Sequence, residues 1–346
     1  MTHRSPTPGV RTKTNVTSSP SFRHWNPGNA LKVLGHELLV GRYELCGLLG
    51  CGGMAEVHDG WDQLLQRNVA VKVLHPALQA QPEVRRRFER EARAAASLCH
   101  SNIVAVHDYG EHDGTPFIIM ERLPGPTLAD LIEQGPMPTD LVWSMLNDVL
   151  GGLAAAHSAA VLHRDIKPAN ILMSAPGDTM KVADFGIAKT GDSARTQIGQ
   201  IIGTLAYMSP ESVSGATPSA GDDLYAVGVM GYEALLGHHL FPEDTPAALV
   251  RAITTGPVPP VAALRDDVHP MLAGVIDRAV ARDPARRFPS AVQMRAALGG
   301  DPHALYAPPP RPHRKVRSRG SPATAGLFVR LRALAGDGAA VRRHAT

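Results

Sequence analysis

The stretch HRDIKPANIL, which spans residues 163–172, places an acid, bases and an amide close together just before an apolar run. Asp165, Lys167 and Asn170 follow one another at spacings of two and three residues. A second acid, Asp184, comes after the short segment KVA, fourteen residues beyond Asn170. Amide and carboxylate oxygens are hard ligands of the kind that Mg²⁺ takes. We therefore predict that Asn170 and Asp184 bind a divalent cation, which leaves Asp165 to orient a nucleophile.

A glycine-rich stretch, LGCGGMAEV, lies upstream between two strand-like segments. Its glycines are Gly50, Gly52 and Gly53. Because glycine has no Cβ, backbone N–H groups beside it can approach a phosphate closely, although such a hairpin is more often only a tight turn. In VAVK, Lys72 lies inside an apolar strand, where a lysine is usually an edge or surface residue. It becomes a candidate functional residue if a carboxylate pairs with it. The segment EREAR offers Glu89 and Glu91, and charge alone does not choose between them.

Two contrasting parts of the chain must position these side chains. Up to residue 122, β-branched and aromatic residues alternate in five strand-like segments, and 83–98 has strong helix formers throughout. From residue 139 onward the sequence is mainly helical, with Thr139 as a candidate N-cap. A strand-rich front joined to a helix-rich back predicts two lobes of an α+β protein. The strand segments are 42–50, 54–62, 68–75, 102–110 and 116–122, and the later helical segments are 139–157, 223–236, 245–254, 268–281 and 289–298.

The charge distribution separates an acidic body from two basic ends. Residues 1–30 carry a net charge of +4, residues 31–300 of −8 and residues 301–346 of +7. Three cysteines without a regular framework are typical of a reducing compartment. The sequence shows neither a signal peptide at its start nor an apolar run of about 18 residues. We therefore expect a cytoplasmic protein without a transmembrane segment.

Five motifs occur in the order and spacing of the protein kinases, which they resemble. The sequences GGMAEV and GTLAYMSPE resemble those of the eukaryotic-like Ser/Thr kinases of bacteria. The motifs are the glycine loop, VAVK, HRDIKPAN, DFG and SPE. The spacing of Lys167 from Asp165, and Thr204 ahead of MSPE, resemble Ser/Thr rather than Tyr kinases. The chain departs from the family pattern at Ala55, which replaces the third glycine of the loop, and at Ser209, a common variant in the SPE motif.

The resemblance implies a two-lobed, protein-kinase-like α+β fold, with a small β-rich N-lobe and a larger helical C-lobe. We expect the kinase domain at residues 42–299, with the N-lobe at about 42–122 and the C-lobe at about 123–299. The flanking segments, 1–41 and 300–346, are expected to be a disordered basic arm and a Pro/Arg-rich basic tail.

The implied reaction transfers the γ-phosphate of ATP to Ser or Thr hydroxyls of proteins, with Mg²⁺ or Mn²⁺ as the metal. By resemblance, Lys72 holds the α- and β-phosphates and pairs with Glu91, while Asp165 orients the substrate hydroxyl and Lys167 steadies the γ-phosphate. Asn170 and the aspartate of DFG bind the metal. The other residues implied to contact ATP are Leu49, Gly50, Gly52, Gly53, Val57, Ala70, Met120 as gatekeeper, Glu121 and Leu123 of the hinge, and Leu172.

The resemblance also implies supporting residues that do no chemistry. Asp223 in DLYAVG resembles the buried aspartate that anchors the catalytic loop, and Glu211 with Arg287 resembles a buried ion pair. His163 and Phe185 resemble the residues that pack behind the catalytic groups.

Two alternative functions remain. A pseudokinase scaffold should lack Lys72, Asp165 or Asp184, and all three are present. A nucleic-acid-binding protein that uses the basic tails is disfavoured, because no aromatic residues interleave with the tail arginines as stacking would require. The expected partners are therefore ATP and protein substrates, together with a second copy of the chain if phosphorylation occurs in trans.

Regulation is predicted at three places. Arg164 can bind a phosphate on the activation segment, residues 184–211, where Thr196 is the expected phosphosite and Ser193 a lesser candidate. Backbone amides around Cys51 can lower the pKa of its thiol, so that oxidation or alkylation there would block ATP, although a buried or inert cysteine is the more common case. Residues 325–335 of the basic tail form a candidate amphipathic helix for peripheral membrane contact.

Overall fold

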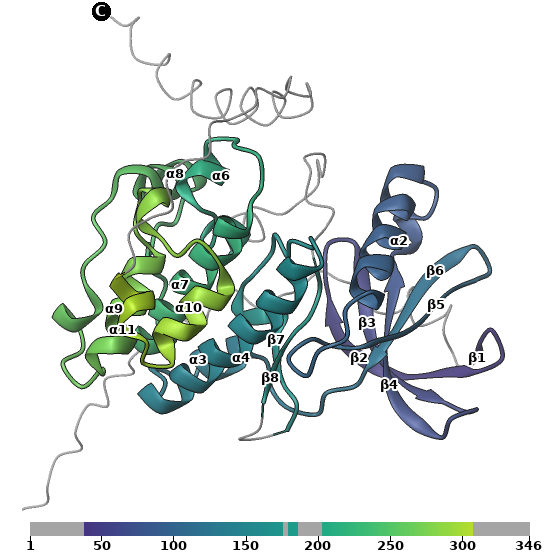
Figure 1. The fold of residues 1–346 in the computed structure, drawn as a ribbon. Helices are drawn as coiled ribbons and strands as arrows, with labels where there is room; N and C mark the ends of the chain where they lie inside the picture. The colour runs from purple at the N-terminus through teal and green to yellow at the C-terminus, as the bar shows by residue number, and fades with distance from the viewer. Residues whose placement is uncertain (1–37, 176–178, 186–202, 307–346) are drawn as a thin grey trace, which may run out of the picture.

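A computed structural model describes residues 38–175, 179–185 and 203–306, which form the two lobes expected from the sequence (Figure 1). The predicted α+β fold, with a β-rich N-lobe and a helical C-lobe, is confirmed. The described N-lobe has one antiparallel sheet in the strand order β1-β2-β3-β4-β6-β5. Its elements are β1 (Leu38–Leu39), β2 (Tyr43–Cys51), β3 (Ala55–Asp62), β4 (Arg67–Leu74), η1 (Pro76–Leu78), α2 (Pro82–Ala96), β5 (Val106–His112) and β6 (Thr115–Glu121).

Strand β1 was not expected, since the sequence predicted five strands from residue 42 onward. Leu38 and Leu39 pair with Glu44 and Tyr43 of β2, and only 3% of Leu39 is exposed. Two residues are too few to show the alternation by which a strand is recognised. The sheet therefore has an additional short edge strand.

The two faces of β4 have different roles because successive side chains in a strand point to opposite sides. Val69, Val71 and Val73 pack with residues of β2 and β6 on the outer face. Leu74 packs on the opposite face against α2. The central lysine of this strand, Lys72, lies on that second face, which is the one turned toward the C-lobe.

The C-lobe is built around α4, whose apolar stripe is fully buried as its helical spacing predicted. Its helix begins at Thr139, but the N-cap residue is Pro138, so the expected cap at Thr139 is wrong by one position. Helix ends depend on local geometry that apolar spacing does not encode. The elements of the lobe are α3 (Leu128–Ile132), α4 (Thr139–Ser158), η2 (Pro168–Asn170), β7 (Ile171–Met173), β8 (Met180–Val182), α6 (Pro210–Val213), α7 (Ala220–Leu236), α8 (Pro246–Thr255), η3 (Val261–Ala263), α9 (Pro270–Ala279), η4 (Pro284–Arg286), α10 (Ala291–Leu298) and α11 (Pro302–Tyr306).

Helices α7 and α9 cross closely inside this core. A Cβ added at Gly228 of α7 would lie 2.6 Å from the Cβ of Ala279 in α9, closer than any real contact. The crossing therefore requires a residue without a side chain at Gly228.

Among the described residues, two links at β8 join the lobes. In the segment between α2 and β5, the backbone N–H of Val104 donates to the carbonyl of Val182 at 2.9 Å, and that of Val182 donates to Asn102 at 2.9 Å. At the end of β6, the ammonium of Lys181 in β8 contacts both carboxylate oxygens of Glu121, at 2.7 and 2.9 Å. Both links end on β8, which leads directly into the DFG motif.

The described framework extends past both expected limits of the kinase domain, 42 and 299. Strand β1 precedes residue 42, and α11 follows α10 with Leu305 only 8% exposed. In the ranges that the structure covers, none of the helices has the length and apolar character needed to cross a lipid bilayer.

Candidate active site

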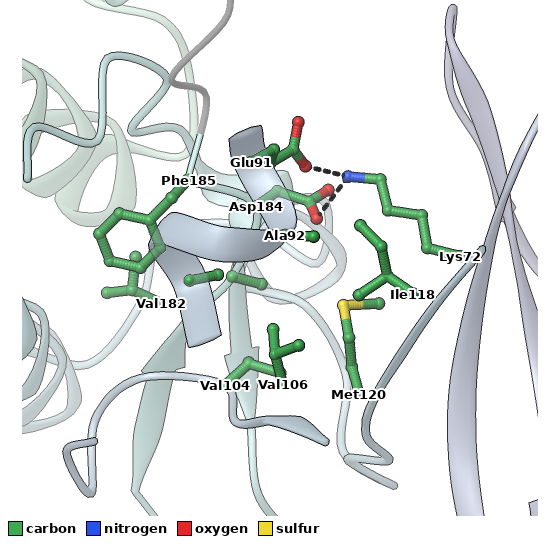
Figure 2. Close-up of a pocket in the computed structure, with 12 residues that line it drawn as sticks. Lys72, Glu91, Ala92, Val104, Val106, Ile118, Met120, Val182, Asp184 and Phe185 are labelled. Atoms are coloured by element: carbon green, nitrogen blue, oxygen red, sulfur yellow. Dashed lines mark hydrogen bonds and ion pairs between the residues drawn. The ribbon is translucent and has the colours of Figure 1, made fainter. Parts of the chain in front are cut away.

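Lys72 connects the two lobes through two carboxylates (Figure 2). Its Nζ atom lies 2.5 Å from Oε1 of Glu91 in α2 and 2.9 Å from Oδ1 of Asp184, which follows β8. The structure also decides between the two glutamates of EREAR. Glu91 is 7% exposed and faces the cleft, while Glu89 points outward and contacts Arg93 at 2.6 Å.

Charge balance keeps this group ionised. Burial acts to lower the pKa of Lys72, but the charges of Asp184 and Glu91 outweigh it and raise that pKa above its usual value. Burial acts to raise the pKa of Asp184, and the charge and hydrogen bond of Lys72 more than offset it, so this pKa is lowered. Burial raises the pKa of Glu91, and the ammonium of Lys72, which is shared with Asp184, offsets this effect only in part. Lys72 therefore favours the ionised form of Asp184 more strongly than that of Glu91, and 39% of the Asp184 side chain is exposed.

The catalytic loop holds Asp165 from two sides. Lys167 Nζ lies 3.0 Å from Oδ2 of Asp165. The amide nitrogen of Asn170 donates to the same oxygen at 3.1 Å and to the Asp165 carbonyl at 2.8 Å. These contacts fix the orientation of the Asp165 carboxylate.

The two residues predicted to bind a metal are brought together by a backbone hydrogen bond. The N–H of Ala183 donates to the carbonyl of Asn170 at 2.9 Å, which places Asn170 beside the neighbour of Asp184. Because the Asn170 nitrogen is committed to Asp165, its side-chain oxygen is the atom left for a cation. An amide oxygen and an ionised carboxylate suit Mg²⁺, so these residues fit the expected metal.

The backbone at both catalytic segments is in the left-handed region. Arg164 has φ 65° and Asp184 has φ 56°, values that cost a non-glycine residue about 1–3 kcal/mol. At Arg164 the buried carboxylate of Asp223 holds this conformation. It accepts hydrogen bonds from the N–H of Arg164 at 2.8 Å, the N–H of His163 at 2.9 Å and Nε2 of His157 at 2.8 Å. Burial acts to raise the pKa of Asp223, but these bonds outweigh it and lower that pKa.

His163 links the catalytic loop to the segment after β8. Its Nδ1 accepts the N–H of Asp165 at 3.2 Å, and its Nε2 donates to the carbonyl of Ala183 at 2.9 Å. Its ring lies 4.7 Å from that of Phe185. Burial lowers the pKa of His163, so the ring is neutral and has a structural role.

The strand register groups part of the predicted nucleotide pocket. Val57 lies opposite both Gly50 and Lys72, and Ala70 lies opposite Met120. Since paired residues share a face of a sheet, Val57, Ala70 and Met120 all lie on the face of Lys72.

Other predicted nucleotide contacts are more dispersed. A cavity of about 20 Å³, enough for about one water molecule, lies between α2 and β8 and is bordered by Met120 (Figure 2). Leu49, Leu123 and Leu172 do not border it. Leu49 is 44% exposed at a bulge of β2, whereas Leu123 is buried at the hinge and Leu172 is half-buried in β7. Gly52 closes the loop turn by donating to the carbonyl of Ala55 at 2.9 Å, and Gly53 is exposed.

The structure bears on one of the regulatory predictions, the one for Cys51. Partial burial and the nearby charge of Glu56 raise the pKa of the Cys51 thiol, so the expected lowering by backbone amides is wrong. Ser193, Thr196 and the tail segment 325–335 lie outside the described residues.

The expected ion pair of the C-lobe is present. Arg287 contacts both carboxylate oxygens of Glu211, at 2.5 and 2.9 Å, and is only 2% exposed. Sequence reasoning missed His157 and Lys181, which contact Asp223 and Glu121. A strand lysine or a helix histidine is no signal by itself, because only the fold brings these partners into contact.

Comparison with known proteins agrees with the kinase-like arrangement of this site. The model of the protein kinase domain family matches residues 43–296. Serine/threonine-protein kinase PknL of Mycobacterium tuberculosis is 41% identical over 273 residues, which cover 78% of this chain and 68% of PknL. Serine/threonine-protein kinase PknB of Mycolicibacterium smegmatis is 42% identical over 270 residues, covering 75% of this chain and 43% of PknB. The crystal structure of the Mycobacterium tuberculosis PknI kinase domain matches with a TM-score of 0.60 at 31% identity, over 77% of this chain and 98% of that chain.

Proposed function

Because this chain belongs to the protein kinase family and is a Ser/Thr kinase of the eukaryotic-like bacterial type, we propose that the cleft around Lys72 performs its phosphoryl transfer. The observation that carries the proposal is the contact of Lys72 with Glu91 and Asp184, at 2.5 and 2.9 Å. This contact joins β4, the strand that carries Lys72, to Asp184, one of the two residues that fit a metal. A pseudokinase scaffold is disfavoured, because Lys72, Asp165 and Asp184 are all present and Lys72 contacts Asp184.

Each residue has a role that follows from its charge and place. Lys72, held charged, binds the α- and β-phosphates of ATP. Asn170 and Asp184 would hold the divalent cation, which supplies neutralisation of the phosphate charge. Lys167, 3.0 Å from Asp165, meets the γ-phosphate where it approaches the substrate. Phosphoryl transfer needs mainly positioning and charge stabilisation, and this arrangement provides both.

Asp165 orients the Ser or Thr hydroxyl of a protein substrate and accepts its proton. Its Oδ2 is held by Lys167 and Asn170, so the carboxylate has one fixed orientation toward an incoming hydroxyl. His163 braces the same loop as a neutral ring. A fixed carboxylate of this kind is typical of a group that selects one productive geometry.

The remaining proposals concern regulation and surroundings. Self-phosphorylation at Thr196, with Ser193 as the lesser site, stays a prediction, as does a homodimer that phosphorylates in trans. Peripheral membrane contact by the tail stays a prediction too. Three free cysteines are consistent with the proposed cytoplasmic location.

The proposed function is tested with purified full-length protein, Mg-ATP and mass spectrometry of the phosphopeptides. We expect phosphate on Ser or Thr residues, with Thr196 dominant. Asp165→Asn should lower turnover by about 10²–10⁴-fold while a fluorescent nucleotide still binds. Asp184→Asn should weaken both turnover and Mg-ATP binding. Full activity in Asp165→Asn would refute the assigned role.

A further inference from the structure

Three side chains capable of binding a metal meet on the outer face of the glycine loop. Cys51 and Glu56 are directly paired across β2 and β3, so their side chains lie on one face. Glu56 is paired with Val73 of β4, and His75 follows Val73 by two residues. Alternation therefore places all three on the face opposite to Lys72. This cluster is separate from the ATP cleft.

The distances within the cluster suit a shared ion. One ligand atom from each of Cys51, Glu56 and His75 lies within 4.8 Å of the other two. His75 Nδ1, the ring nitrogen that remains available for a metal, is 3.7 Å from Glu56 Oε1. The Cys51 thiol lies beside the same ring, with Sγ 4.0 Å from the other nitrogen, Nε2. Tetrahedral zinc bonds of 2.0–2.3 Å place neighbouring ligand atoms about 3.5 Å apart. Small side-chain rotations close the difference.

The surroundings hold two of these ligands in place. Glu56 Oε2 contacts His58 Nε2 at 3.1 Å, and His75 Nε2 contacts the carbonyl of Gly52 at 2.8 Å. Metal-binding carboxylates and imidazoles are commonly oriented by such outer contacts. The side chains of Glu56 and His75 are only 15% and 22% exposed, while Cys51 is exposed and open to an entering ion.

We propose that Cys51, Glu56 and His75 bind Zn²⁺, or a divalent transition metal of similar preference, with water as the fourth ligand. A thiolate, an imidazole and a carboxylate form a donor set that zinc takes readily. Mg²⁺, which requires oxygen ligands, does not compete effectively for the thiolate. The site is therefore distinct from the metal site that serves ATP.

The bound ion links the end of β2 to the residue that follows β4. His75 already donates its backbone N–H to the carbonyl of Met54 at 3.0 Å, so it is a rigid anchor for the loop. A metal bond from Cys51 to this anchor restrains the glycine loop, which must move when nucleotide enters and leaves. We expect metal binding to slow phosphoryl transfer, and this second step rests on the proposed function.

Binding is measured with Co²⁺ as a spectroscopic substitute for zinc, in the full-length Cys46→Ser/Cys99→Ser variant, where Cys51 is the only thiol. We expect a thiolate-to-cobalt charge-transfer band that excess Zn²⁺ abolishes. Adding Cys51→Ser should remove the band. Adding His75→Ala or Glu56→Gln should weaken Co²⁺ binding about tenfold or more.

Absence of the band in the parent variant would overturn the site. An unchanged affinity in both His75→Ala and Glu56→Gln would also overturn it, because the thiol would then bind metal alone. The kinase assay follows, with Zn²⁺ and excess Mg-ATP. If Zn²⁺ inhibits the wild type and inhibits His75→Ala less, the restraint of the glycine loop is supported. Equal wild-type rates with and without Zn²⁺ refute it. Since the band is read without catalysis, failure of the metal site and failure of the proposed kinase function are distinguishable.

Discussion

Asp223→Asn tests whether one buried carboxylate sets the geometry of the catalytic loop. One oxygen of Asp223 accepts the backbone N–H of Arg164, and the other accepts His157 and the N–H of His163. Asparagine has only one acceptor oxygen. Its best orientation keeps the two bonds to the histidines and turns an NH₂ group toward Arg164. The backbone of Arg164, at φ 65°, then loses the hydrogen bond that holds it.

The expected cost follows from this single lost contact. A hydrogen bond to a charged group contributes about 1.5–3 kcal/mol. We expect the free energy of unfolding to fall by about 2–3 kcal/mol. For a domain of this size the melting temperature should fall by about 4–12 °C. Because Arg164 precedes Asp165, kcat should fall about tenfold or more, with little change in the KM for ATP.

Thermal unfolding and steady-state kinetics on the same preparation measure both effects. The matched control is Asp266→Asn, an exposed aspartate at which the change should stay within about 0.5 kcal/mol. A wild-type melting temperature and kcat in Asp223→Asn would refute the anchoring argument. A lower melting temperature with an unchanged kcat would refute the link from the Arg164 backbone to Asp165.

Three further predictions test packing and electrostatics. Glu211→Ala leaves a buried arginine without its partner and should cost about 3–5 kcal/mol in urea unfolding. Gly228→Ala places a methyl group in the α7–α9 crossing and should cost about 1–3 kcal/mol, whereas Gly274→Ala meets only ordinary contacts and should be neutral or stabilising by up to about 1 kcal/mol. A hydrogen bond from Arg42 lowers the pKa of Asp62 to about 2, so its stabilisation is present above about pH 4 and is lost toward pH 2. Arg42→Gln should therefore be less stable near neutral pH, with the difference from wild type narrowing as the pH falls through that range.

Each of these results can also fail in a defined way. A wild-type urea midpoint for Glu211→Ala would mean that water replaces the lost carboxylate. Equal stability of the two glycine variants would show that α7 and α9 separate at no cost. A stability difference for Arg42→Gln that stays constant between pH 5 and pH 2 would contradict the assigned cause of the Asp62 shift.

Regular patterns in the sequence explain why the fold could be predicted. The alternation of residues around Lys72 corresponds to the two faces of β4. The apolar residues at helical spacing in 139–157 form the buried stripe of α4. These periods are properties of the strand and the helix themselves, so they can be read without any tertiary contact. The short strand β1 has no such period and was missed.

The parts of the site that could not be predicted depend on contacts between distant segments. Glu89 and Glu91 have the same charge, but their positions on a helix differ by about 200°, and only packing against Lys72 distinguishes them. The left-handed backbone of Arg164 is unexpected for a residue other than glycine. Cys51 meets His75 only through the register of three strands, and charges around its thiol were invisible in the sequence.

The two links at β8 limit how the cleft can open. A body attached at one point can swing and twist freely, but attachment at two points leaves rotation about the line that joins them. Here one link is the backbone ladder at Val104 and Val182, and the other is the end of β6, where Glu121 meets Lys181. Once the contact between Lys72 and Asp184 separates, opening should therefore be a one-axis hinge motion, in which the sheet tilts as a rigid plate. The axis runs beside β8, so the DFG motif lies near the pivot and the glycine loop sweeps the longest arc.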